Sequence, residues 1–338
     1  MLKIYQIMQL LSINRTVPFY PLLPPFYPPL LPFTFTPFTL IHGLGMDKDI
    51  WVNPSKSRIL GGMFPLTVLL SKRHQRNDSV SDTNSSGDTI STPLTDEQTD
   101  NLQTLFDALR VKEYPTITWS QERPAGTIDS VVVELKEVVK IAKKMTKEGV
   151  VLIGHSRGGL IGRKYLMRKD KSIKVLITIS TPHKGSSVAK IANYLSPLIS
   201  VIDPFFHGGD KGSFSFSIKR IFDFLKSRAL KELLPESHFF KSLKDGPCDG
   251  VYYVSVGGTD PTLFSLYNFL IPDIFEKVIP KNLYPEEIKR GKGDGLVSAE
   301  SSKIPWGSEH YNFPLNHAEI LFDKRVRDVL VEAMEETF

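Results

Sequence analysis

The stretch that decides the fold is Val150–Gly159, which reads Val-Val-Leu-Ile-Gly-His-Ser-Arg-Gly-Gly. Its four leading apolar residues predict a buried strand, and Leu160–Arg163 continues as a helix. Ser156 falls on the sharp turn between them, with a glycine two residues before it and another two residues after it. Such glycines let the strand and the helix approach closely, so the hydroxyl stands exposed at the carboxyl edge of a sheet. Ser156 is therefore a candidate nucleophile.

Short apolar runs alternate with amphipathic segments on both sides of this turn. Runs of Val, Ile and Leu without polar alternation are typical of strands that helices cover on both faces. The pattern predicts an α/β protein with a mostly parallel central sheet and helices on both faces. We expect strands at Phe38–Ile41, Leu66–Leu70, Thr116–Trp119, Val150–Ile153, Ile173–Ile179 and Val251–Val256. We expect helices at Asp96–Leu109, Ile128–Lys144, Arg157–Arg168 and Ala318–Glu335.

The composition excludes several classes of protein. The chain has 338 residues, of which 41% are hydrophobic and 23% are charged, so it can bury a core. Its 42 Lys and Arg exceed its 37 Asp and Glu, but this excess is spread thinly, and we expect no nucleic-acid partner. The single cysteine, Cys248, has no internal disulfide partner, and no Cys/His spacing typical of zinc occurs, so we expect neither metal nor cofactor. No apolar run free of proline is long enough for an ordinary membrane-spanning helix.

The chain divides into an N-terminal extension and a catalytic domain. Residues 1–36 are rich in proline and favour an extended polyproline II path. The apolar start has no small-residue cleavage site after it, so there is no clear signal peptide; the location stays open, with the cytoplasm slightly favoured. We expect the catalytic domain to span residues 37–338, with the polar segment Ser71–Asn101 as a solvated loop.

Residues 186–250 are too long for an ordinary connection and predict a cap, or lid, inserted into the domain. Apolar residues at helical spacing predict an amphipathic cap helix: Ile218, Ile221, Phe222, Leu225, Leu230, Leu233 and Leu234. Aromatic residues are frequent in the same insertion: Tyr194, Phe205, Phe206, Phe214, Phe216, Phe222 and Phe224. These rings suit an ester or lipid substrate and transient contact with a lipid interface, or they pack the cap onto the core; the two interpretations are compatible.

A serine hydroxyl is a poor nucleophile at neutral pH and needs a base together with a group that orients the base. In a fold with this turn, the acid and then the histidine follow the serine along the chain. The downstream histidines are His183, His207, His238, His310 and His317. We favour His317, because a loop before the final helix would deliver it to the sheet edge, and His310 is its rival. His42 precedes the serine and is expected to make structural hydrogen bonds.

The candidates for the acid that orients the histidine are Asp245, Asp249, Asp260 and Asp294. We favour Asp294, because the glycines on either side of it permit a tight turn that buries a carboxylate beside an imidazole. Asp260 directly follows a predicted strand and is the main competitor. The tetrahedral intermediate also needs two N–H donors for its oxyanion. We expect these to be the backbone amides of Arg157, which follows the serine, and of Leu44, in the turn after the first strand.

Together these motifs resemble the α/β-hydrolase superfamily and, within it, the lipase and esterase branch, including bacterial triacylglycerol lipases and hydrolases related to glycosylphosphatidylinositol deacylases. The motifs, in chain order, are HGLG at 42–45, GHSRGG at 154–159, STPHKGS at 180–186, GDGLVS at 293–298 and NHAEI at 316–320. The resemblance implies an α/β-hydrolase fold with a helical cap insertion. It implies Ser156, Asp294 and His317 as a catalytic triad and Leu44 and Arg157 as oxyanion donors. The arginine after the serine departs from many such lipases, which carry a smaller or apolar residue there.

The sequence therefore predicts a serine hydrolase that cleaves carboxylic esters through an acyl-enzyme. Two other classes remain open. An acyltransferase would use the same triad with an alcohol in place of water, and a non-catalytic binding module could use the same fold. Acyl-chain length, the preference between lipase and esterase substrates, and oligomeric state are not determined by these motifs.

Overall fold

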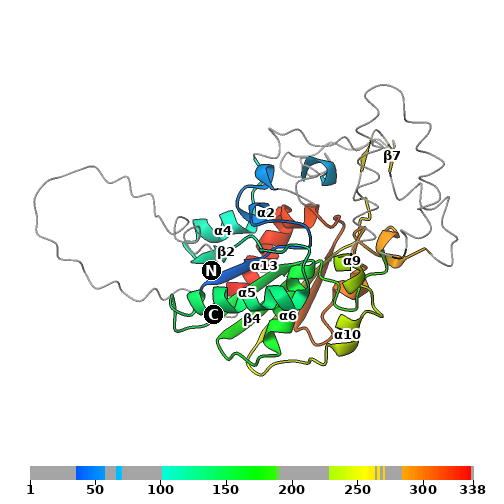
Figure 1. The fold of residues 1–338 in the computed structure, drawn as a ribbon. Coiled ribbons are helices and arrows are strands. Elements are labelled where there is room, and N and C mark those ends of the chain that lie inside the picture. Colours follow the sequence, from blue (N-terminus) through cyan, green and yellow to red (C-terminus); the bar gives the residue numbers. More distant parts are fainter. Residues whose placement is uncertain are drawn as a thin grey trace, which may run out of the picture.

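The computed structural model describes residues 36–57, 66–70, 101–188, 190, 228–262, 265–266, 269–270 and 284–335. Its central element is a six-stranded sheet with the strand order β2-β1-β3-β4-β5-β8, in which every neighbouring pair is parallel (Figure 1). The strands are β1 (Phe38–Ile41), β2 (Thr116–Thr118), β3 (Val150–His155), β4 (Ile173–Ile179), β5 (Tyr252–Gly258) and β8 (Glu309–Phe313).

Helices cover both faces of this sheet (Figure 1). On one face α5 (Ile128–Ala142) and α6 (Arg157–Leu166) pack against each other and against β1. On the other face α4 (Leu105–Val111) and α13 (Lys324–Glu335) contact each other. The shorter elements are α2 (Asp49–Val52), η1 (Pro54–Lys56), η2 (Leu66–Leu69), α9 (Arg228–Glu232), α10 (His238–Ser242), β6 (Ser265–Leu266), β7 (Phe269–Leu270), η6 (Glu286–Ile288), α12 (Ala299–Ser302) and η7 (Glu319–Leu321). The expected mostly parallel sheet with helices on both faces is confirmed.

The core lies on both sides of β3, whose six residues are all buried. α6 packs against this strand, and α5 packs one apolar face against α6 and β1. The N-cap Thr127 begins α5 by accepting a hydrogen bond from the backbone N–H of Ser130. Val131, Leu135 and Val138 are buried on that face, while Val133 lies on the other side of the helix and is 64% exposed. Each large apolar side chain buried in this way contributes about 1.5–3 kcal/mol, so the packing holds the carboxyl end of β3 in a fixed place.

The strand order reverses beside β3. After β1 the chain moves outward to β2, whereas after β3 it moves in the opposite direction to β4, β5 and β8. A crevice opens where the connections leave two neighbouring parallel strands in opposite directions, and ligands of open α/β sheets bind there. The segments that follow β1 and β3 carry Leu44 and Ser156, so both candidate residues lie at this switch point.

Several sequence-based expectations about the elements were wrong. Leu66–Leu70 was expected to be a strand, but its first four residues form a 3₁₀ helix. Of the helix expected at Asp96–Leu109, residues 96–100 lie outside the described residues, residues 101–104 are not helical, and α4 begins at Leu105 after the N-cap Thr104. β8 was missed, because its sequence Glu-His-Tyr-Asn-Phe is largely polar and it lies at the sheet edge, partly exposed. The final helix is interrupted between η7 and α13.

Some expectations fall outside the described residues. They are the Pro-rich extension at 1–35, most of the loop at 71–101, the greater part of the expected cap helix, and the seven aromatic residues named above for the insertion. The domain boundaries therefore stay predictions. Within the described ranges, no helix is both long and apolar enough to span a lipid bilayer.

Gly154→Ala is expected to destabilise the protein by about 3 kcal/mol or more, because a Cβ at this position would lie 2.3 Å from the backbone nitrogen of Gly159, which cannot move without breaking the turn. The measurement is urea unfolding followed by circular dichroism. Gly246→Ala is the control, since a Cβ there meets no atom within 4 Å. Equal stability of the two variants would contradict the close approach of β3 and α6.

Candidate active site

Ser156 sits on a strained turn between β3 and α6. Its backbone angles are φ 53° and ψ −126°, a region that a side chain other than glycine rarely adopts. Its N–H donates to the carbonyl oxygen of Ile179 at 2.8 Å, and its own carbonyl accepts from Gly159 at 3.1 Å. Ser156 is 8% exposed and stands at the N-terminus of α6, where the helix dipole favours negative charge. The structure thus has the turn that the motif predicts.

Close contacts to glycines fix α6 against its neighbours. A Cβ on Gly158 would lie 2.3 Å from the carbonyl oxygen of Ile41, at the end of β1. A Cβ on Gly159 would lie 2.0 Å from the hydroxyl of Thr181, in the turn after β4. Because these neighbours occupy the space of the missing side chains, the first turn of α6 lies between the ends of the two strands that flank β3.

Asp294 and His317 are brought together across 23 residues of chain. The Nδ1 of His317 is 2.9 Å from the Oδ2 of Asp294, and both side chains are buried. The other carboxylate oxygen of Asp294 accepts from the backbone N–H groups of Leu296 and Val297 at 3.0 and 2.7 Å. Because Asp294 thereby holds Nδ1–H, the Nε2 of His317 is the ring nitrogen that can accept a proton.

The loop that carries His317 is also held through its backbone. The N–H of His317 donates to the carbonyl oxygen of Asp294 at 3.0 Å. The side chain of Asn316 caps the next turn by accepting from Ala318 and Glu319, each at 2.9 Å, and donates to the carbonyls of Leu69 and Thr262. Sequence analysis did not single out Asn316, although the Asn-x-x-Glu spacing of a capping box was a signal for it.

The turn after β1 lies directly against the serine. A Cβ on Gly43 would be 3.1 Å from the Cβ of Ser156, so the backbone of this turn can approach the hydroxyl. The turn closes through a hydrogen bond from the N–H of Met46 to the carbonyl of Gly43, with Gly45 at φ 70°. Leu44 therefore sits in a tight turn beside the serine, and Arg157 is the first residue of α6, whose amide has no partner within the helix.

His42 organises this turn as a neutral imidazole. Its Nδ1–H donates to the carbonyl of Gly43 at 3.0 Å, and its Nε2 accepts from the backbone N–H of Gln121 at 3.1 Å. The side-chain amide nitrogen of Gln121 also donates to the backbone carbonyl of His42, at 3.0 Å. Burial lowers the pKa of His42 to about 4 and outweighs the hydrogen bond to Gly43, so the ring is uncharged at neutral pH.

The depressed pKa of His42 predicts loss of stability in acid. Between its usual pKa of 6.5 and its folded pKa of about 4, the unfolded chain binds a proton that the folded chain does not. The free energy of unfolding should therefore fall by about 1.4 kcal/mol per pH unit for this group as the pH drops through that window. Urea unfolding of the wild type and His42→Asn at several pH values measures it. The variant should show the shallower dependence, and identical slopes would contradict the buried neutral His42.

Four of the alternative bases and acids have other hydrogen-bond partners: His183, His310, Asp245 and Asp260. His310 lies in β8, with its Nδ1 at 2.9 Å from the hydroxyl of Ser255. His183 is buried, and its Nε2 lies 3.0 Å from the hydroxyl of Thr178. His238 begins α10, and His207 lies outside the described residues. Among the acids, Asp245 binds Arg163, Asp249 lies in the turn before β5, and Asp260 accepts from the backbone N–H of Thr262 at 3.0 Å.

Arg157 has a structural role that sequence analysis missed. Its side chain is fully buried and donates to the carbonyl of Pro124 at 2.9 Å and to the carbonyl of Gly126. It thereby ties the residue after the serine to the segment between β2 and α5. Burial lowers the pKa of Arg157, while the nearby carboxylates of Glu232 and Glu134 act in the opposite direction. A guanidinium can reach two carbonyls at once, which a smaller side chain at this position could not do.

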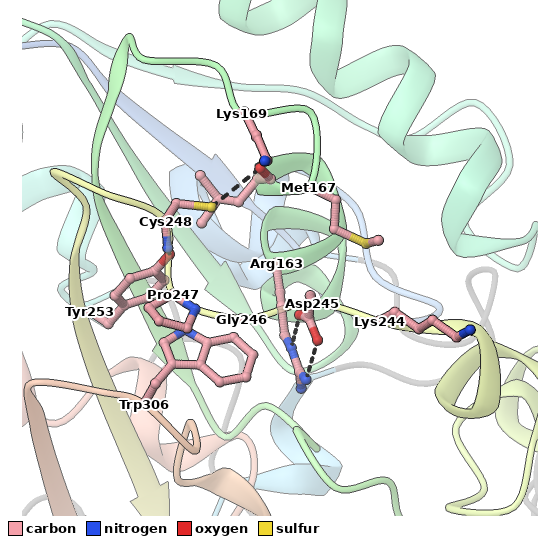
Figure 2. A pocket seen from close by; sticks show the side chains of 11 residues that line it. Arg163, Met167, Lys169, Lys244, Asp245, Gly246, Pro247, Cys248, Tyr253 and Trp306 are labelled. Atoms are coloured by element: carbon pink, nitrogen blue, oxygen red, sulfur yellow. Dashed lines mark hydrogen bonds and ion pairs between the residues drawn. The ribbon is translucent and has the colours of Figure 1, made fainter.

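A second arginine of α6, Arg163, binds a carboxylate near the end of the expected insertion. Arg163 binds both carboxylate oxygens of Asp245 (Figure 2). It also donates to the carbonyl of His183 at 2.8 Å. Its guanidinium also lies 4.8 Å from the ring centre of Trp306. Arg163, Asp245 and Trp306 line a cavity of about 150 Å³ near the C-terminal end of α6. Its lining on α6 begins at Arg163, about 10 Å along the helix axis from Ser156.

The described residues contain no group of three or more His, Cys, Asp or Glu side chains arranged to hold a metal ion.

Comparison with known proteins agrees with this architecture. The family model of palmitoyl protein thioesterases matches residues 82–221, which include Ser156 and end before Asp294 and His317. No curated protein matches the chain. The mature form of the Bacillus licheniformis lipase BlEst2 is 14% identical, with a TM-score of 0.51, and the match covers 89% of this chain and 92% of that one. Its propeptide form is 14% identical with a TM-score of 0.50, covering 89% and 50%.

The chain has the α/β-hydrolase fold, with a parallel six-stranded central sheet and flanking helices like those of a bacterial lipase. The resemblance to the lipase and esterase branch that the motifs suggested is confirmed at this level. At 14% identity the likeness concerns the fold, and the chemistry has to be argued from the site itself.

Proposed function

We propose that this protein hydrolyses carboxylic esters with Ser156 as nucleophile, His317 as general base and Asp294 as the group that orients His317. The observation that carries the proposal is the buried Asp294–His317 hydrogen bond of 2.9 Å, with the His317 loop packed against the residue that precedes the strained Ser156. The hydrolase fold and the match to a thioesterase family support the same class of reaction.

In the first half of the reaction, the Oγ of Ser156 attacks the ester carbonyl carbon while its proton passes to the Nε2 of His317. Asp294 stabilises the imidazolium that forms and keeps its own charge. The backbone amides of Leu44 and Arg157 donate to the oxyanion. The intermediate then collapses, the bond to the leaving oxygen breaks, and His317 returns the proton to the departing alcohol. The acyl group is left on Ser156.

In the second half, water takes the place of the alcohol. His317 removes a proton from the water as it attacks the acyl carbon, and the same two amides receive the second oxyanion. Collapse breaks the bond to Ser156, whose Oγ regains its proton from His317, and the carboxylic acid departs. No cofactor is required, because the serine supplies the nucleophile and the histidine carries each proton.

Ser156→Ala is expected to lower kcat on p-nitrophenyl esters by roughly five to six orders of magnitude, since removing the nucleophile of a comparable triad has that effect. The matched control is Ser180→Ala. Ser180 is also buried at the end of a strand with a positive φ of 46°, and it has no part in the proposed chemistry. The control should keep its activity, and a Ser156→Ala variant with more than a few per cent of the wild-type rate would refute the assignment.

A thioester is a second candidate substrate, favoured by the palmitoyl protein thioesterase match across the segment that contains Ser156. The same triad can attack a thioester, whose leaving thiolate needs less help from an acid. The discriminating measurement compares kcat/KM on oxygen esters and thioesters with the same acyl groups, from acetyl to palmitoyl. If the protein is an oxygen-ester hydrolase, it should turn over the oxygen esters at an appreciable rate. Turnover of the thioesters alone would assign the protein to the thioesterases.

Two further tests address the remaining alternatives. Adding glycerol to the assay and searching for ester products separates a hydrolase from an acyltransferase. The predicted lipid-facing cap is tested by raising the ester concentration through its solubility limit. A rise in rate on the emulsion is expected if the cap contacts lipid, and a flat response would indicate that its aromatic residues pack onto the core.

A further inference from the structure

His155, the residue immediately before the serine, is buried at the end of β3 and plays no part in the proton transfers described above. Its Nε2 lies 3.0 Å from the backbone carbonyl oxygen of His317. A carbonyl oxygen only accepts hydrogen bonds, so His155 carries its proton on Nε2 and donates it to the His317 loop. This bond joins positions that are 162 residues apart in the chain.

Two more contacts place His155 between the three segments of the site. Its ring centre lies 4.8 Å from that of His317, with the rings tilted by 50°. A Cβ built on Gly43 would be 3.1 Å from the Nδ1 of His155, so the turn that carries Leu44 packs on the same ring. His155, at the end of the strand that precedes the serine, thus contacts both the loop of His317 and the turn that carries Leu44.

We propose that His155 is a positioning residue, whose Nε2–H holds the backbone of His317 so that the imidazole meets the serine hydroxyl. The inference rests on the proposed function, since it assigns His155 a role in orienting the proposed base. The Asp294 carboxylate fixes the rotation of the His317 ring, and His155 fixes the carbonyl of the same residue. The backbone N–H of His317 also donates to the carbonyl oxygen of Asp294, so His317 is held at three points.

The charge state of His155 fits this role. Burial, the neighbouring His317 and His42 all lower the pKa of His155, and its hydrogen bond to the carbonyl of His317 only partly opposes them. The ring therefore stays neutral at ordinary pH and places no positive charge beside an imidazole that must accept a proton. Among the described residues its Nδ1 has no hydrogen-bond partner, as the Nε2–H tautomer of a buried neutral ring allows.

The test compares His155→Phe with His155→Gln. Phenylalanine keeps a planar ring but removes the donor, and a displacement of about 1 Å in a catalytic group can cost 100-fold, so kcat should fall roughly 10- to 100-fold with KM within about twofold. The amide nitrogen of glutamine reaches approximately the position of Nε2, so His155→Gln should recover most of the lost kcat. A loss in kcat that glutamine restores is not expected of a residue that only fills space.

His183→Phe is the matched control. His183 is equally buried, its Nε2 makes one hydrogen bond, and its Nδ1 is likewise unpartnered among the described residues, but it binds Thr178 rather than the His317 loop. The His183→Phe variant should keep the wild-type kcat, even if its free energy of unfolding falls as much as that of His155→Phe. The proposal is overturned if His155→Phe keeps the wild-type kcat, if glutamine and phenylalanine are equally impaired, or if His183→Phe loses as much kcat.

A measurement that does not depend on activity separates this proposal from the proposed function. In the ¹⁵N-labelled wild type, the ring signals of His155, assigned by their loss in His155→Gln, should show a protonated Nε2 and a bare Nδ1. The opposite tautomer or a charged ring would overturn the inference. If Ser156→Ala stays active, the proposed function fails, and the ring signals still decide whether His155 donates to His317.

Discussion

The structure depends on the strained turn at Ser156. A serine at φ 53° costs of order 1–3 kcal/mol, and such a conformation persists only where the surroundings determine it. Here the surroundings are the buried strand β3, the hydrogen bond to Ile179, and the close contacts of Gly158 and Gly159 with the ends of the neighbouring strands. A larger side chain at either glycine would push α6 away and release the turn.

The parallel sheet explains how residues far apart in the chain meet. Carboxyl ends of parallel strands lie at one edge, so the segments after β1, β3, β5 and β8 all emerge there. Hydrogen bonds then fix them to one another: Asp294 to His317, His317 to His155, and Gln121 to His42. Each bond connects two segments that are distant in the chain, which makes the geometry a property of the whole domain.

Two buried arginines of α6 extend this scaffold outward. Arg157 joins the first turn of the helix to the segment after β2, and Arg163 joins the last turns to Asp245 near the end of the expected insertion. Buried charges are costly unless they are paired and hydrogen-bonded. Arg163 forms an ion pair with Asp245, whereas Arg157 donates to two backbone carbonyls. The arginine after the serine, which departs from many lipases, is thus used to hold the chain.

The sequence was informative where a local pattern has one structural meaning. The apolar run before Ser156 and the glycines around it predicted the sheet and the turn. The serine–acid–histidine order pointed to Asp294 and His317, whose side chains lie 2.9 Å apart, and the triad itself stays a prediction. It failed where tertiary contacts decide: β8 is polar because it lies at an edge, and Leu66–Leu69 forms a 3₁₀ helix despite its apolar character. The roles of His155 and the Arg157 side chain depend on partners 162 and about 30 residues away, which no local pattern reveals.

The most direct test of the central claim is covalent labelling with a fluorophosphonate, followed by peptide mass spectrometry. Such a reagent reacts only with a serine that a neighbouring base activates. The account predicts one adduct per folded chain, located on Ser156, and its loss in His317→Gln. An unmodified wild-type chain, or labelling that persists without the His317 imidazole, would contradict it.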